Sequence, residues 1–290
     1  MTTMPAPRKN ANRVVNAMTV DVEDWFQVQA FANTIDRAAW DGLERRVEAN
    51  TNRILDMFGD AGIHATFFTL GWVAERYPAL IRRITAEGHE LASHGYWHRL
   101  VHEQTPEDFA ADITSARKLL EDTGGVAVTG YRAPTFSINT RNPWAFDVLE
   151  AAGYRYSSSI YPIRHDLYGM PDAPRAPFRP TSGQLVEIPM TTLRAFGRNF
   201  PSAGGGYFRL LPYAAFRASL RRVNTTEAAP GMFYTHPWEI DPGQPRVTAA
   251  PALAKFRHYL NLSRTADRIG RLLTDFAWDR VDQVFASALR

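Results

Sequence analysis

The 290-residue sequence predicts an α/β fold with a parallel sheet, either a barrel or a doubly wound sheet. The first reason is that apolar runs of strand length alternate with amphipathic stretches of helical period along the first half of the chain. The second reason is that polar, chemically active residues gather where the apolar runs stop. Active sites of parallel α/β folds lie at these carboxyl ends of the strands, so the pattern also predicts where a site forms.

The N-terminal part of the chain contains the first strand–helix–strand pattern. The apolar run at 14–18 predicts a buried first strand, and residues 43–58 carry an apolar stripe of helical period. Gly62 follows close to the end of that stripe, as is typical of a helix C-terminus. Residues 65–70 then predict a second strand, and the apolar positions between 73 and 84 predict a second helix.

The next unit continues the same alternation. Residues 90–92 lead out of a predicted strand into a polar segment. Thr105 followed by Pro106 predicts a helix start, because threonine caps a helix and proline fits its first turn. The glycine pair at 124–125 ends that helix, and residues 126–128 are expected to begin the following strand.

The second half of the chain is less regular. Six prolines between 161 and 201 predict a long loop region over the barrel mouth, and the glycine run at 204–206 predicts a mobile or tightly turned element beside it. An apolar strand is expected at 231–235. The apolar stripe after Pro251 and a helix over 265–276 should pack against the barrel.

Two histidines four residues apart, His94 and His98, are the most informative pair in the sequence. Residues at this spacing lie on the same side of a helix or of a tight turn, and neutral imidazole is a common ligand of Zn²⁺. A lone pair of this kind also arises by accident among eight histidines. Further ligands are therefore needed before a metal site is predicted.

An acidic cluster directly after the first predicted strand supplies such ligands: Asp21, Glu23 and Asp24. A carboxylate is the usual third partner of two histidines in a site that keeps an open position for water. Because side chains alternate along a strand, Glu23 lies on the same face as Asp21. We therefore expect Glu23 to be the third ligand, with Asp24 as the alternative if the chain has already turned.

Two further segments complete a pattern that no single residue establishes. Arg132 is followed at a spacing of two by Pro134, and His236 ends the apolar strand expected at 231–235. The order of strand carboxylate, histidine pair, arginine–proline turn and strand histidine resembles the NodB-type polysaccharide deacetylases of carbohydrate esterase family 4. The resemblance spans roughly residues 14–240.

Three sequence segments narrow the resemblance to the subfamily associated with exopolysaccharide and exosortase gene clusters. They occupy residues 20–26, 203–212 and 256–262. The resemblance implies a distorted (β/α) barrel with a catalytic domain at 14–240 and a C-terminal helical extension at 241–290 that packs on the barrel.

The resemblance also implies a role for each matching residue. Asp21 would be the general base, oriented by Arg132, and His236 would be the general acid. The remaining roles are Glu23, His94 and His98 as metal ligands and the backbone N–H of Thr135 as an oxyanion donor. Independently of the resemblance, five aromatic residues expected near the mouth of the barrel either offer flat apolar faces to sugar rings or belong to the core: Trp25, Tyr96, Trp97, Tyr131 and Trp238.

Two positions depart from the family pattern. Val22 stands where most relatives have a second aspartate next to the first, which is why the carboxylate ligand must come from a shifted position. Ser157 stands where relatives have an aspartate that tunes the catalytic histidine. Because serine supplies no negative charge, another carboxylate should support His236. The candidates are Glu239, Asp241 and Asp166.

The composition excludes several classes of protein. Hydrophobic residues make up 45% of the chain and charged residues 22%, as in an ordinary globular protein. The net charge of +3 comes without a dense basic run, so no nucleic-acid partner is expected. The chain has no cysteine, which excludes disulfides and thiolate metal sites.

No apolar run approaches the ~18 residues of a membrane span. Residues 1–13 are polar and show no secretory signal, so a cytoplasmic location is expected. The sequence gives no indication of the oligomeric state.

The function implied is a metal-dependent hydrolase that removes N-acetyl groups from a sugar of a bacterial exopolysaccharide or its precursor. Zn²⁺ is the first expectation for the metal, and Co²⁺, Ni²⁺ or Fe²⁺ fit the same ligands. Two alternatives remain. The first is a hydrolase of small cyclic amides on the same fold, which would have a closed small pocket. The second is a carbohydrate-binding protein that has lost catalysis, which would bind no metal.

Overall fold

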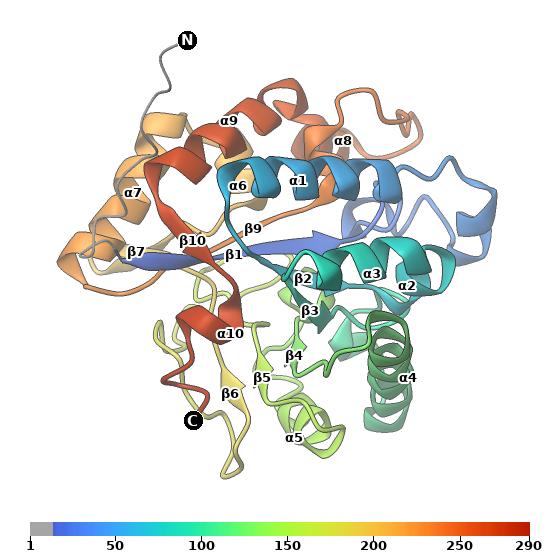
Figure 1. Ribbon diagram of the computed structural model, residues 1–290, viewed down its shortest axis with the longest axis horizontal. Helices are drawn as coiled ribbons and strands as arrows, with labels where there is room; N and C mark the ends of the chain where they lie inside the picture. The colour runs from blue at the N-terminus through green and yellow to red at the C-terminus, as the bar shows by residue number, and fades with distance from the viewer. Residues whose placement is uncertain (1–13) are drawn as a thin grey trace.

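The centre of the molecule is an eight-stranded sheet whose pairs are all parallel (Figure 1). The computed structural model describes residues 14–290, so the prediction about a secretory signal at 1–13 lies outside the described residues. The strands of this sheet are β1 (Val15–Val22), β2 (Thr66–Thr69), β3 (Glu90–Ser93), β4 (Gly130–Tyr131), β5 (Tyr156–Ser157), β6 (Val186–Glu187), β9 (Met232–Thr235) and β10 (Ala277–Asp279).

Strands β1 to β6 lie side by side in chain order, and the last two strands return to β1. In β1, Ala17–Val20 pair with β9, whereas Val15–Ala17 pair with β10. A single bridge between Gly204 and Tyr234 extends the curved sheet beyond β9. This parallel half-barrel confirms the predicted fold class.

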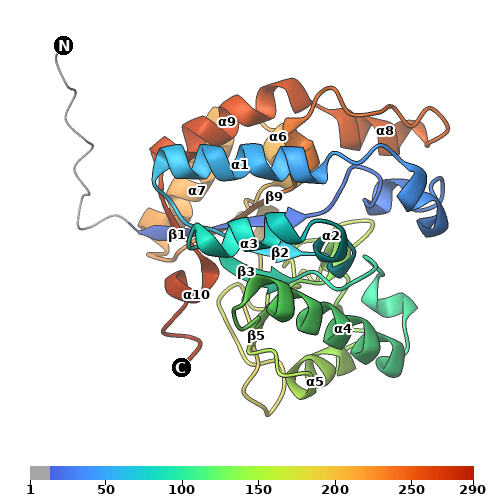
Figure 2. The ribbon, with the colours of Figure 1, turned by 45° about the vertical axis from the view of Figure 1, so that its right-hand side comes forward.

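Helices cover the outside of the curved sheet, with α1 and α9 along β1 and with α3 and α4 beside β2 and β3 (Figures 1 and 2). The helices are α1 (Val47–Ala61), α2 (Gly71–Arg76), α3 (Pro78–Ala86), α4 (Pro106–Gly124), α5 (Trp144–Ala151), α6 (Gly205–Leu210), α7 (Tyr213–Thr226), α8 (Ala252–Tyr259), α9 (Leu262–Asp275) and α10 (Val281–Val284).

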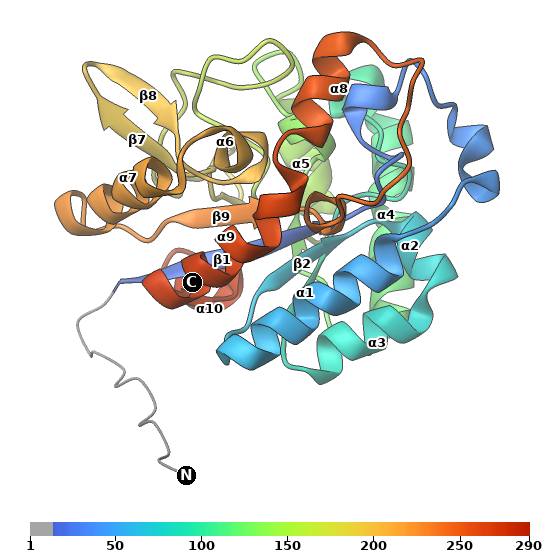
Figure 3. The same cartoon turned by 90° about the horizontal axis from the view of Figure 1, so that it is seen from above.

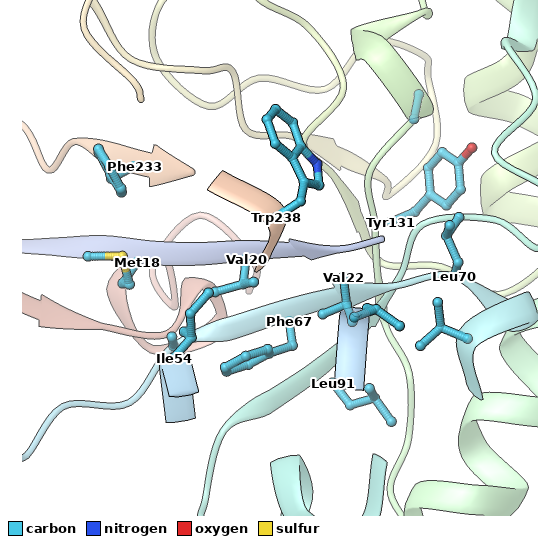
Figure 4. Close-up of a cluster of buried hydrophobic side chains, with 14 of the residues drawn as sticks. Met18, Val20, Val22, Ile54, Phe67, Leu70, Leu91, Tyr131, Phe233 and Trp238 are labelled. Carbon is cyan, nitrogen blue, oxygen red and sulfur yellow. The ribbon is translucent and has the colours of Figure 1, made fainter. Parts of the chain in front are cut away.

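The alternation of side chains along the strands divides the core into two layers. Met18, Val20 and Val22 of β1 belong to the layer that packs under the helices, and Figure 4 shows them with Ile54 of α1 and Phe67 of β2. The other layer, inside the barrel, contains the intervening positions, such as Ala17 in β1, Phe68 in β2 and Met232 in β9. Asp21 has the parity of Ala17, which directs its side chain inward.

The helix boundaries follow the predicted capping residues in two cases. Helix α1 ends at Ala61 and is capped by Gly62, whose left-handed backbone (φ 63°) lets its N–H bond to the carbonyls of Gly59 and Phe58. Helix α4 begins after Thr105, whose hydroxyl accepts a hydrogen bond from the N–H of Asp108.

Two predicted elements differ from the structure. The single helix expected over 73–84 is broken at Tyr77 (φ −129°, ψ 58°), because Pro78 disfavours a helical conformation in the residue before it. Residues 126–128 do not begin a strand: the N–H of Val128 donates to the carboxylate of Glu121 in α4, and β4 starts only at Gly130.

The segment at 161–201 is also more ordered than a loop. It contains β6 and a two-stranded antiparallel hairpin formed by β7 (Thr192–Ala195) and β8 (Arg198–Pro201). At the glycine run, Gly204 has φ 124°, and a Cβ there would lie 2.1 Å from the carbonyl oxygen of Tyr234. This run is therefore a tight turn into α6.

The predicted C-terminal extension at 241–290 packs on the barrel, but it is not only helical. Its strand β10 pairs with the first half of β1 and becomes part of the central sheet. Among the described residues, no helix is both long enough and apolar enough to cross a membrane.

Candidate functional site

The candidate site contains a buried ion pair between Asp21 and Arg132. Nη1 of Arg132 donates to Oδ1 of Asp21 at 2.6 Å and to the hydroxyl of Thr19 at 2.8 Å. The arginine is fully buried, and its Nε donates to the carbonyl of Ser158. Because the guanidinium is held on several sides, it fixes the position of the Asp21 carboxylate.

Three potential metal ligands converge beside this pair: Glu23, His94 and His98. One ligand atom of each lies within 4.8 Å of the others, and all three residues are buried. Glu23 follows the end of β1, while the histidines flank the turn after β3. This turn places His98 in a left-handed conformation (φ 50°), and Arg37 holds it by donating to the carbonyls of Trp97 and His98.

The donor atoms in this cluster fit a divalent metal. Nδ1 of His94 lies 2.8 Å from the carbonyl oxygen of Arg132, so the nitrogen carries the proton there and Nε2 keeps a free lone pair. Nε2 of His98 lies 2.7 Å from Oε2 of Glu23, yet this buried oxygen accepts no well-aligned hydrogen bond among the described residues. A nitrogen and an oxygen this close to each other, but not aligned for a hydrogen bond, are typical of two ligands that point at the same metal ion.

Protonation states in the cluster also suit metal binding. Burial lowers the pKa of His94 to about 4, so its imidazole is neutral at neutral pH. Burial by itself would raise the pKa of Glu23, but the adjacent His98, His236 and His94 lower it to about 2. A neutral imidazole and an ionised carboxylate are the forms that bind a metal.

Asp24, the alternative ligand, is not part of this cluster. Its Oδ2 accepts hydrogen bonds from the N–H groups of Arg46 and Val47, at the start of α1, and Oδ1 accepts one from the N–H of Trp25. The chain turns directly after Glu23, which sends the next side chain toward the helix. Asp24 is therefore a helix-capping residue.

His236 lies beside two carboxylates of the site, Asp21 and Glu23. Its Nε2 is 3.8 Å from Oδ2 of Asp21 and 3.7 Å from Oε1 of Glu23, and its Nδ1 is 2.7 Å from Oε1 of Glu239. The supporting carboxylate expected from the sequence is thus Glu239. Of the other two candidates, Asp241 pairs with Arg46 and Asp166 with Arg257.

The Glu239 carboxylate is itself anchored by Arg209. Nε of Arg209 donates to Oε2 of Glu239 at 2.6 Å, and its Nη1 donates to the carbonyls of His258 and Leu260. Burial opposes ionisation of Glu239, but Arg209 and His236 lower its pKa below the ordinary value. Both ends of this buried pair come from the C-terminal half of the chain.

The combined charges change the acidity of His236. Burial by itself would lower its pKa, whereas the hydrogen bond to Glu239 and the negative charges of Glu23, Glu239 and Asp21 raise it to about 9. Ser157, at the position where the resemblance led us to expect an aspartate, donates to the hydroxyl of Ser159 and is fully buried.

Trp238 lines the pocket and is largely buried, so it combines the two positions that the sequence left open, a pocket wall and the core. Its ring stacks against the imidazoles of His236 (5.1 Å between centroids) and His258 (4.2 Å). Its Nε1 donates to Oε1 of Glu23 at 3.1 Å. The indole therefore orients a potential metal ligand.

A pocket of about 380 Å³ opens onto these residues. Asp21 and the metal-ligand cluster lie at its base, and Thr135, the expected oxyanion donor, lines it with a left-handed backbone (φ 55°). Aromatic side chains line the wall: Phe136, Tyr168, Tyr207, Tyr234 and Phe256.

Arg209 is the site residue that sequence reasoning missed. It is one of 33 basic residues in the chain and lies 30 positions before its partner, so neither spacing nor composition distinguishes it. The only feature of the sequence that draws attention to Arg209 is its place in the segment 203–212, one of the three segments that carry the subfamily resemblance.

Two family models match the chain. Residues 29–157 match the polysaccharide deacetylase family, and residues 158–286 match a domain of unknown function, DUF3473. The two regions share one sheet, since β5 ends at the boundary and β6, β9 and β10 follow it. They also share the site: His94, His98 and Arg132 come from the first region, and His236 and Glu239 from the second.

Curated relatives match shorter stretches of the chain. A peptidoglycan-N-acetylglucosamine deacetylase of Bacillus cereus is 32% identical over 84 residues, which is 29% of this chain and 30% of that protein. A chitooligosaccharide deacetylase of Rhizobium leguminosarum bv. trifolii is 26% identical over 145 residues, which is 50% of this chain and 60% of that protein. In both cases the chain covers less than two thirds of the relative.

Solved structures match nearly the whole chain. A Mycobacterium smegmatis structure assigned to the polysaccharide deacetylases has a TM-score of 0.62 and 19% identity, and covers 99% of this chain and 94% of that one. A mutant of a CE4 family pseudoenzyme with restored activity has a TM-score of 0.50 and 11% identity, with 95% and 68% of the two chains covered. At these identities the likeness shows the fold alone.

Proposed function

The chain carries a polysaccharide deacetylase domain followed by a DUF3473 region, and from this premise we propose that it is a metal-dependent deacetylase. The proposed reaction removes N-acetyl groups from a sugar of a bacterial exopolysaccharide or its precursor. The observation that carries the proposal is the convergence on one pocket of a metal-ligand cluster, the Asp21–Arg132 pair and the His236–Glu239 pair.

Glu23, His94 and His98 would hold the metal. When bound, a divalent ion supplies a Lewis acid that polarises the acetyl carbonyl and makes water a better nucleophile at neutral pH. Trp238, by donating to Oε1 of Glu23, leaves Oε2 on the side of His98. Zn²⁺ is the first choice for such a donor set, and the donor atoms alone admit Co²⁺, Ni²⁺ or Fe²⁺.

Asp21 is proposed as the general base. Arg132 binds its Oδ1, which leaves Oδ2 on the side of the pocket to accept a proton from the attacking water. His236 is proposed as the general acid that donates a proton from Nε2 to the departing nitrogen. One proton is taken from water and one is delivered to the amine, so the products are acetate and the free amino sugar.

Glu239 is proposed as a positioning residue for the acid. Its Oε1 accepts the proton on Nδ1 of His236, so the proton available for transfer lies on Nε2, which faces Asp21 and Glu23. The backbone N–H of Thr135 is proposed to stabilise the negative charge that develops on the acetyl oxygen.

The pocket favours a saccharide over a small cyclic amide. Its volume of about 380 Å³ and its aromatic wall suit a sugar unit. A hydrolase of small cyclic amides would instead have a small closed pocket that fits only the ring. The presence of base, ligands and acid in one place supports catalysis rather than saccharide binding alone. A cytoplasmic location stays a prediction from the sequence.

The experiment that tests the proposal combines metal content with acetate release. The purified chain should retain about one divalent ion and release acetate from N-acetylated oligosaccharides such as chitooligosaccharides. His98→Ala should lose both properties, whereas His102→Ala, a change of the same residue type outside the cluster, should keep them. A chain that holds no divalent ion after metal reconstitution and releases no acetate would exclude the proposed function.

A further inference from the structure

Exposed apolar side chains gather around the mouth of the pocket. They are Leu167 (49% exposed), Leu210 (52%), Leu253 (56%) and Phe256 (55%), and we call these four residues the rim. All four line the same pocket as the catalytic groups, although they come from a loop, from α6 and from α8. Large apolar side chains that remain half-exposed and gather from several segments are typical of an interaction surface.

The β7–β8 hairpin adds a further apolar side chain on this side of the molecule. Phe196 at the hairpin tip is 96% exposed. Asn199 fastens the hairpin to the loop of Leu167 by donating to the carbonyl of Pro162 at 2.8 Å. Figure 3 shows β7, β8 and α8 reaching the same upper edge of the molecule, with α6 and the yellow-green loop between them.

The segments that carry these apolar side chains also carry an excess of positive charge. Three segments carry the hairpin tip and the rim residues of the loop and of α8. Together they contain five cationic side chains and two carboxylates, and they span residues 164–172 (the loop), 194–200 (the hairpin tip) and 252–259 (α8). One carboxylate, Asp166, is paired with Arg257 at 2.9 Å. The cations are Arg164, Arg194, Arg198, Lys255 and Arg257.

Apolar side chains interleaved with arginine and lysine are the combination that binds an anionic lipid surface. The apolar groups enter the boundary between headgroups and acyl chains, and the cations remain at the level of the phosphates. A second protein copy would bring the same positive charge to this surface and would be repelled. The excess of cations therefore favours a lipid surface over self-association.

We propose that the rim and the tip of the β7–β8 hairpin dock on the headgroup layer of an anionic bilayer, with the pocket mouth facing the lipid. The docking itself is independent of catalysis, whereas its consequence rests on the proposed function. That consequence is the substrate class: a saccharide held at the membrane surface, such as one attached to a lipid, reaches the pocket without leaving the bilayer.

Vesicle flotation of the full chain tests the docking. The chain should float with vesicles that contain phosphatidylglycerol, remain behind with phosphatidylcholine alone, and be released by high salt, because the attraction to charged lipid is screened. The double variant Leu253→Ser/Phe256→Ser should lower the partition coefficient about tenfold or more. Arg194→Gln/Arg198→Gln, which removes two charges, should lower the partition coefficient about thirtyfold.

Two matched controls change residues elsewhere. Val126→Ser removes an apolar side chain of similar exposure (41%) between α4 and β4, and Arg82→Gln removes an exposed charge on α3. Both should float like the parent chain. Melting temperature and metal content establish that each variant is folded.

Three outcomes would overturn the docking proposal: failure of the parent chain to float with anionic vesicles, equal losses in the control variants, or a dimer that the rim variants dissociate while flotation is absent. Acetate release from a soluble oligosaccharide is measured separately. A chain that floats but neither binds metal nor releases acetate would contradict the proposed function and leave the docking standing.

Discussion

Nδ1 of His236 donates a hydrogen bond to Oε1 of Glu239 at 2.7 Å, and the other oxygen of the same carboxylate accepts one from Arg209 at 2.6 Å. The three side chains form a buried chain of alternating charge that ends at the pocket. Burial alone would make His236 a weaker base, but Glu239 and the site carboxylates raise its pKa to about 9. The imidazole is therefore held in the protonated form that a general acid needs.

Glu239→Gln should move the alkaline limb of the kcat profile to lower pH. A raised pKa keeps the proton on His236 up to alkaline pH, so removal of the negative charge that raises it shifts the loss of activity downward. Activity at the optimum should fall about tenfold to a hundredfold, as is usual when the partner of an active-site histidine is removed. Acetate release measured against pH checks this.

Asp241→Asn is the matched control, because this nearby carboxylate binds Arg46 and Asn50 and not His236. The alkaline limb of its kcat profile should stay at the pH that the unmutated chain shows. An unchanged limb in Glu239→Gln would mean that Glu239 does not set the acidity of His236.

Asp21→Asn and His94→Ala should fail in different ways. Asp21→Asn should keep the metal and lose about 10²–10⁴-fold in kcat, because it removes the proposed general base. His94→Ala should lose both metal and activity, because it removes a ligand of the cluster. Metal analysis of the two purified variants decides the assignment. Loss of metal in Asp21→Asn together with retention in Glu23→Gln would show that the two carboxylates have the opposite roles.

Asp24→Ala should lower stability and leave the metal in place. Its carboxylate accepts hydrogen bonds from the first N–H groups of α1, so its removal should cost about 1–2 kcal/mol of unfolding free energy, as loss of a helix cap does. Urea denaturation measures this cost. Glu44→Ala, which removes an exposed carboxylate nearby, should change stability by less than about 0.5 kcal/mol. Metal loss in Asp24→Ala would make Asp24 a ligand after all.

Much of the first half of the fold could be predicted because its elements are long enough to show a period. Strand β1, helices α1 and α4 and their capping residues Gly62 and Thr105 all follow from local patterns. Strands β4, β5 and β6 have two residues each, which is too short for any alternation to appear. Strand β10 could not be predicted either, because it is defined by its pairing with β1, from which it is separated by more than 250 positions in the sequence.

The candidate site likewise contains residues whose place could be predicted from local patterns and residues whose place could not. The convergence of Glu23 with the histidine pair follows from the alternation of side chains along a strand and from a spacing of four. Asp24 could not be excluded by that reasoning, because its partners at the start of α1 lie more than 20 positions away. The same holds for Arg209, whose importance depends on a contact with Glu239 that has no local pattern.

Ser157→Asp, which introduces the aspartate that the family resemblance led us to expect at this position, should destabilise the protein and should not rescue Glu239→Gln. Ser157 is fully buried and lies opposite Glu187 in the pairing of β5 with β6. Glu187 already accepts the N–H groups of Ser159 and Ile160, and burial raises its pKa. A second carboxylate there would have no cation to pair with, since Arg132 is bound to Asp21 and to Ser158.

We expect Ser157→Asp to lose about 3 kcal/mol or more of unfolding free energy at neutral pH. Burial and the neighbouring Glu187 would raise the pKa of the new carboxyl, so the loss should be small in acid, where the group is neutral, and should grow as the pH rises through its folded pKa. Ser157→Ala, which introduces no charge, should lose much less and show no such pH dependence. Urea denaturation at several pH values measures both variants. A Ser157→Asp variant that is as stable as the parent and restores activity to Glu239→Gln would show that a carboxylate at position 157 can support His236.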